Sequence, residues 1–128
     1  MRTNYFSTTL DLPATGTIAT PGYTLEHQEG YSWVINIPSG DAVGAFTLEM
    51  SNNAYLESQD PTVQGGFKVG PAAVWVTITG TSQNVTTGAN TIAYNVTGAN
   101  YRWVRLLYTA TSGTATATYY YASKGPQS

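Results

Sequence analysis

The sequence predicts an all-β protein that folds as an antiparallel β-sandwich, with a jelly-roll-like arrangement as the expected form. Three observations predict this class. Short segments alternate apolar and polar residues with period 2, and turn residues recur between them at intervals of about eight to twelve residues. No segment carries an apolar stripe at helical spacing. Periodicity leaves the order of the strands within the sheets open.

The strongest pattern covers residues 100–121, which read NYRWVRLLYTATSGTATATYYY. Val104, Leu106 and Tyr108 share one face of a first strand, and a second strand follows the turn that ends at Gly113. A glycine there can take a positive φ without strain. We expect a hairpin with one apolar face, which must pack against a second sheet because an isolated hairpin is marginal in water.

The other elements follow from the same alternation. Residues 1–12 form either a first strand or an extended arm, and Pro13 ends it because proline lacks an N–H donor. Further strands are expected at 15–20, 31–37, 43–51, 73–79, 83–86 and 91–96. The strands 31–37 and 43–51 are expected to pair as a hairpin, with Trp33 in the core and Glu49 facing solvent.

Domain boundaries follow from these elements. Residues 13–123 are expected to form a single β-sandwich domain, and 124–128 a polar C-terminal tail. Residues 52–71 show no sustained period, and a loop of that length commonly carries function or an interface.

Composition excludes several classes of function. The chain has 128 residues, a net charge of −2, only 9% charged residues and no cysteine. Disulfides are therefore excluded, and a nucleic-acid partner is not expected because such modules carry a basic patch. We expect no membrane partner, because no apolar run is long enough to span a bilayer and the N-terminus lacks a cleavable signal pattern. A polar, weakly charged surface has little self-repulsion, which suits a homo-oligomer.

No residue pattern indicates catalysis. His27 with Glu26 and Glu29 is better read as a charged surface loop than as a metal site. No nucleophile stands beside a base, and no glycine pattern resembles a phosphate-binding loop. We therefore expect a protein that is not an enzyme and that has no cofactor or metal.

Aromatic residues are in excess, with ten Tyr, three Trp and three Phe. They suit three alternatives: sheet faces that are covered on both sides, a protein interface, or a flat surface for sugar rings. The candidate partner-binding residues are Tyr5, Phe6, Tyr55 and Phe67. The candidate sugar-binding residues are Trp75, Trp103, Arg105 and Tyr120.

Four motifs resemble small β-sandwich virion structural proteins of tailed bacteriophages. They are Ser51-Asn52-Asn53, then Trp75-Val-Thr-Ile, then Tyr101-Arg-Trp-Val-Arg-Leu-Leu-Tyr-Thr, then Ser112-Gly113-Thr114, and the likeness covers roughly residues 31 to 122. Asn53 stands where an acid is usual, which weakens any cation site at that turn.

The resemblance implies a virion component that is assembled in the bacterial host cytoplasm. The leading expectation is a capsid decoration or cement protein that binds the major capsid protein or other virion proteins as a homo-oligomer, a trimer among the expected states. The residues leave two alternatives open: a carbohydrate-binding module that binds a surface glycan on a tail or capsid, and a tail or baseplate adaptor.

Overall fold

The computed structural model describes residues 3–25, 28–52, 56–59, 67–69, 74–98 and 101–125. Every regular element in these ranges is a strand, which confirms the predicted all-β class. The strands are β1 (Thr3–Leu12), β2 (Thr17–Ala19), β3 (Tyr23–Thr24), β4 (Gly30–Ile37), β5 (Val43–Ser51), β6 (Leu56–Gln59), β7 (Phe67–Val69), β8 (Val76–Thr77), β9 (Gln83–Val85), β10 (Asn90–Thr97), β11 (Trp103–Ser112) and β12 (Ala115–Lys124). In this part of the chain, no helix could cross a membrane.

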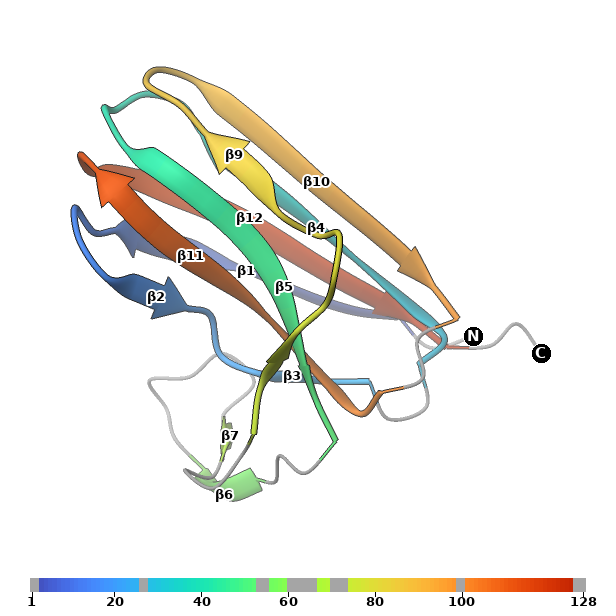
Figure 1. Ribbon diagram of the computed structural model, residues 1–128. Helices are drawn as coiled ribbons and strands as arrows, with labels where there is room; N and C mark the ends of the chain where they lie inside the picture. The colour runs from blue at the N-terminus through green and yellow to red at the C-terminus, as the bar shows by residue number, and fades with distance from the viewer. Residues whose placement is uncertain are drawn as a thin grey trace.

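The strands form two packed antiparallel sheets with jelly-roll connectivity (Figure 1). Sheet A has the order β1-β12-β4-β10, and sheet B has the order β2-β11-β5-β8, with β3 paired to β11 and β9 paired to β5. The connections from β1 to β2, β3 to β4, β4 to β5, β9 to β10, β10 to β11 and β11 to β12 each pass from one sheet to the other. This repeated crossing is the double Greek key of a jelly roll, as the sequence predicted.

Both expected hairpins are wrong. β11 lies in sheet B and β12 in sheet A, and β5 likewise faces β4 from the opposite sheet instead of pairing with it. Alternation shows which side chains point toward the core, but it does not distinguish a strand that lies beside its neighbour from one that lies across the core. The expected positive φ at Gly113 is confirmed, at 69°.

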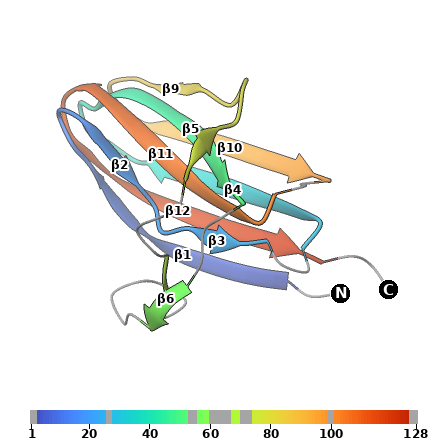
Figure 2. The ribbon, with the colours of Figure 1, turned by 60° about the horizontal axis from the view of Figure 1, so that its bottom comes forward.

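One end of the domain matches a predicted alternative and the other differs from expectation. Of the two alternatives for residues 1–12, the structure has the strand: β1 pairs along its whole length with β12, from Thr3↔Lys124 to Leu12↔Ala115. Lys124 therefore ends a strand and does not begin a tail, and 126–128 lie outside the described residues. The start of β1 and the end of β12 therefore lie together at one end of sheet A (Figures 1 and 2).

The structure differs from the predictions in two further segments, residues 52–71 and 73–79. β6 and β7 pair with each other inside the segment expected to be a loop. The strand expected at 73–79 is reduced to β8, whose two residues pair with β5. The short strand expected at 83–86 is confirmed as β9.

The core between the sheets is dominated by aromatic rings. Trp33 is fully buried, as predicted, and its ring lies 4.7 Å from that of Tyr121, which stacks on Tyr23 at 4.6 Å. Tyr23 and Tyr119 share a hydrogen bond of 2.6 Å between their hydroxyls, and Tyr31 is likewise bonded to Tyr101. Burial raises the pKa of all of these hydrogen-bonded tyrosines, so they remain neutral donors and acceptors in the folded protein.

Candidate interaction surface

The outer face of sheet A is built by strand register. Ser7, Tyr120, Val34 and Ala93 stand in one row across β1, β12, β4 and β10. Because side chains alternate between the two faces of a strand, every second residue from this row points away from the core. The flanking rows are Tyr5, Ala122, Ser32 and Asn95 on one side and Thr9, Thr118, Asn36 and Thr91 on the other.

Three large apolar side chains lie exposed on this face, on the neighbouring strands β1, β12 and β4. Tyr5 is 73% exposed, Tyr120 52% and Val34 42%, although each belongs to a regular strand. They border a shallow, mainly apolar hollow of about 370 Å³ that is also lined by Ser32 and Ala122. Exposed apolar residues that gather on one rigid face indicate an interaction site, whereas scattered ones do not.

The rest of the outer face is polar and almost uncharged. Among its described side chains, Asp11 and Lys124 are the charged ones, and they stand at opposite ends of the β1–β12 pair. A second hollow, of about 600 Å³, lies at the Lys124 end, where Glu29 and Asn95 contribute to its lining. The surface between these ends offers hydroxyl, amide and aromatic groups, so a partner would bind it without desolvating charge.

The predicted partner-binding residues do not form one group. Tyr5 lies on the outer face of sheet A, but Phe6 points inward, where its ring stacks on Tyr23 at 5.0 Å. Tyr55 lies outside the described residues, and Phe67 is the first residue of β7. Val34 was not predicted, because an apolar residue between core positions of a strand carries no sequence signal until its neighbours across the sheet are known.

The predicted sugar-binding residues are also divided. Tyr120 belongs to sheet A, whereas Trp103 and Arg105 belong to sheet B. Trp103 is only 7% exposed, so its ring does not offer a surface for a sugar. Alternation placed it on the outer side of β11 but could not show what covers it. The four residues therefore form no common flat surface.

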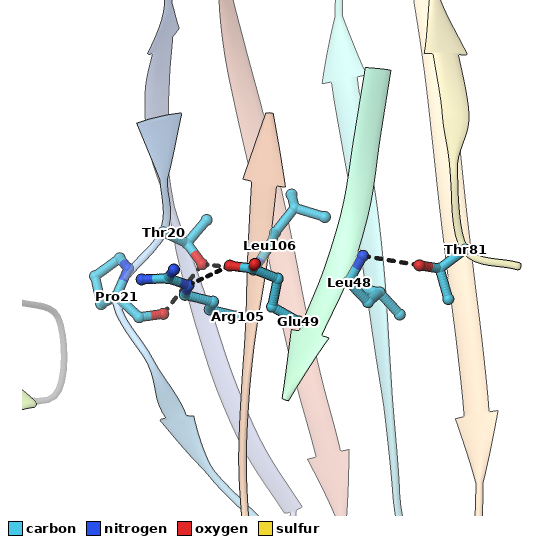
Figure 3. Close-up of polar contacts among 7 residues, drawn as sticks. All are labelled: Thr20, Pro21, Leu48, Glu49, Thr81, Arg105 and Leu106. Carbon is cyan, nitrogen blue, oxygen red and sulfur yellow. Dashed lines mark hydrogen bonds and ion pairs between the residues drawn. The ribbon is translucent and has the colours of Figure 1, made fainter. Parts of the chain in front are cut away.

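Two of them meet on sheet B, where the guanidinium of Arg105 lies 4.4 Å from the ring centroid of the half-exposed Trp75. Arg105 Nε also donates a hydrogen bond of 2.7 Å to Glu49 Oε1, across the directly paired positions of β11 and β5 (Figure 3). Glu49, expected to face solvent, is 8% exposed. Its cross-strand partner could not be identified before the register was known.

The surroundings of this ion pair are polar and ordered. Thr20 accepts a hydrogen bond of 3.0 Å from the backbone N–H of Leu106 and donates one of 3.0 Å to the carbonyl of Pro21 (Figure 3). Glu49 has its charge neutralised by Arg105, which is itself covered on one side by an indole ring. The arrangement is typical of a structural ion pair, because each charged group is held by the other and by its neighbours.

Within the described ranges, no three His, Cys, Asp or Glu side chains gather closely enough to hold a metal ion. Glu26 and His27, two members of the charged loop weighed from the sequence, lie outside those ranges. Two features stand out among the described residues: the exposed apolar group on the weakly charged outer face of sheet A, and the ion pair beside an indole on sheet B.

Comparisons with known proteins give no family. No protein-family model matches the chain, and no curated protein matches its sequence. One similar solved structure comes from Bacillus endospore appendages, a novel family of disulfide-linked pili. It is 16% identical, with a TM-score of 0.42, and the match covers 97% of this chain and 89% of the other. A likeness at this level carries no conclusion about function.

Proposed function

We propose that this protein is a non-enzymatic structural component of a tailed-phage virion, a decoration protein that binds the capsid lattice as a homo-oligomer. The observation that carries the homo-oligomer in this proposal is the outer face of sheet A, on which Tyr5, Val34 and Tyr120 are exposed together. Tyrosine is enriched in protein interfaces, and the motifs between Ser51 and Thr114 resemble those of phage virion proteins.

The fold suits such a role because its binding surfaces are held on regular strands. The surface residues Tyr5, Tyr120 and Val34 belong to neighbouring strands of sheet A, and their opposite faces are fixed in an aromatic core. Many copies on a symmetric capsid would each add a modest contact, and attachment of one subunit of an oligomer raises the effective concentration of the next.

Co-sedimentation tests the proposal. The purified chain, labelled with a fluorophore, is mixed with expanded phage capsids that were assembled without it, and the capsids are pelleted. We expect saturable binding that reaches a fixed number of copies per capsid. Capsids that already carry their full complement of the unlabelled chain are the matched control and should pellet little label. If the chain stays in the supernatant with undecorated capsids, the proposal is wrong.

Carbohydrate binding on a virion tail or capsid is a second candidate, and it depends on Trp75. Its ring is half-exposed beside Arg105, the kind of pair that can stack on a sugar and bind its hydroxyls. A glycan array discriminates between the two, because this alternative predicts binding that Trp75→Ala abolishes. The adaptor alternative is distinguished by locating the chain in the tail or baseplate of an imaged virion.

A further inference from the structure

We infer that the outer face of sheet A binds the same face of a second copy of this chain, in an antiparallel arrangement related by a two-fold axis. The inference rests on the proposed function for its biological setting and names the partner of the surface described above. The two-fold contact itself is a property of the isolated chain, so it can be tested without a capsid.

The positions of two charged residues support a second copy as the occupant. In the β1–β12 pair, Asp11 stands opposite Thr116 at one end, and Lys124 stands opposite Thr3 at the other. Tyr120 is midway between Thr116 and Lys124, so the two ends lie at equal distances from it, about 13 Å each at 3.3 Å per residue.

This spacing makes the face complementary to itself. A two-fold axis that lies in the plane of the contact, runs across the strands and passes near Tyr120 brings Asp11 of each copy toward Lys124 of the other. A contact of this kind is isologous, because both copies use the same surface. Each contact between two residues therefore occurs twice, once in each direction. With the strands of the two copies parallel, Asp11 would instead approach Asp11, and like charges placed together disfavour association.

The apolar centre supplies most of the contact in this arrangement. Val34 and Tyr120 are neighbours in register, Tyr5 lies one row away, and all three are brought to the middle of the dimer. The charged ends set the orientation and add less to the affinity, because Asp11 and Lys124 are exposed and Glu29 lines the hollow beside Lys124.

The size of the face indicates how tight the dimer should be. Four strands spaced about 4.8 Å apart and about eight residues long cover a footprint of about 500 Å² per copy, or about 1,000 Å² for the pair. Specific interfaces begin at about this area, and small ones are weak. We therefore expect a reversible dimer with a dissociation constant on the order of micromolar.

Sedimentation velocity of the purified full chain tests the inference, at concentrations from about 1 µM to about 500 µM. We expect a concentration-dependent equilibrium between monomer and dimer. Val34→Lys should weaken the dimer at least tenfold, because it places a charge at the apolar centre of both copies. The matched control is Val76→Lys: Val76 is 51% exposed in a strand of sheet B, and the same change there should leave the dimer intact.

Charge reversal tests the orientation with residues at the exposed ends of the face. Asp11→Lys or Lys124→Glu alone should weaken the dimer about tenfold, since each change affects two symmetric contacts. The double variant Asp11→Lys/Lys124→Glu should restore wild-type affinity. Circular dichroism of every variant shows whether it remains folded.

Several outcomes overturn the inference: a monomer or a trimer throughout the concentration range, a dimer that Val34→Lys leaves unchanged, or a single charge reversal that tightens association. A dimer that does not bind capsids would contradict the proposed function and leave this contact standing. Capsid binding by an oligomer other than this dimer would contradict the contact and leave the proposed function standing.

Discussion

The hydroxyl of Tyr94 in β10 lies 3.0 Å from the carbonyl oxygen of Phe46 in β5, so a side chain of sheet A is hydrogen-bonded to the backbone of sheet B. The same hydroxyl lies 2.6 Å from the carbonyl oxygen of Thr81, in the turn between β8 and β9. Burial raises the pKa of Tyr94 to about 12, which keeps the hydroxyl protonated and able to donate. This contact fixes an edge strand of one sheet against the other.

Removing this hydroxyl should destabilise the fold. We expect Tyr94→Phe to lower the free energy of unfolding by about 1–2 kcal/mol, because it leaves buried carbonyl groups without their donor. Tyr120→Phe removes the same atom from an exposed ring and should change stability by less than about 0.5 kcal/mol. Urea unfolding of both variants measures the difference, and equal effects would contradict a role for the Tyr94 contact.

Stability should fall in alkali. A buried tyrosine whose pKa is raised stays protonated in the folded state, while the same group in the unfolded chain loses its proton above about pH 10. Its contribution is therefore fully present below pH 10 and is lost as the pH rises through the folded-state pKa. For Tyr94 the window runs from about pH 10 to about pH 12, and burial extends the loss to higher pH at Tyr23 and Tyr31.

Each such tyrosine should lower the free energy of unfolding by about 1.4 kcal/mol for every pH unit within its window. Guanidinium unfolding at a series of pH values from 8 upward measures this slope, with roughly constant stability expected below about pH 10. Tyr94→Phe should reduce the slope between about pH 10 and about pH 12. If the free energy of unfolding does not change above about pH 10, burial does not keep these hydroxyls protonated in the folded state.

Loss of the ion pair between Arg105 and Glu49 on sheet B should lower the stability of the fold, because Glu49 is buried. Arg105→Ala removes both the guanidinium that neutralises Glu49 and the group that stacks on Trp75, so we expect a loss of about 1–3 kcal/mol in unfolding free energy. Arg102→Ala, at an exposed position three residues away, is the control and should have a small effect. If Arg105→Ala/Glu49→Gln is no more stable than Arg105→Ala, the cost does not come from a stranded carboxylate.

The connection between β11 and β12 should tolerate no side chain at Gly113. Its φ is 69°, and a Cβ there would overlap the carbonyl group of Asp41. Gly16 has a similar φ of 78° with open space around it, so Gly16→Ala measures the backbone strain alone, about 1 kcal/mol. We expect Gly113→Ala to cost at least about 3 kcal/mol in thermal or chemical unfolding. Equal costs for the two variants would exclude the steric effect.

Local alternation predicted much of the fold. The inward positions Val104, Leu106 and Tyr108 of β11 are buried, and Trp33 is central to the core. Pairing was not predictable in the same way, because a strand with one apolar face fits equally well beside its neighbour or across the core from it. Both expected hairpins failed for this reason.

The candidate surfaces show the same limit. Tyr5 and Tyr120 were recognised as aromatic residues with different roles, and only the register of β1, β12 and β4 brings them together with Val34. In the same way Glu49 could not be assigned to Arg105 before β5 and β11 were aligned. Strand direction and face are local properties, whereas the composition of a sheet surface depends on residues far apart in the chain.

The pairing of β1 with β12 has a consequence for biosynthesis. The strand that leaves the ribosome first is hydrogen-bonded along its length to the strand that leaves last, so sheet A cannot close until the whole domain has been translated. Until then the backbone of β1 is available to any other extended segment, including the β12 of a neighbouring nascent chain on the same polysome. Conditions that slow elongation before β12 has been translated should therefore favour exchange of β1 between copies.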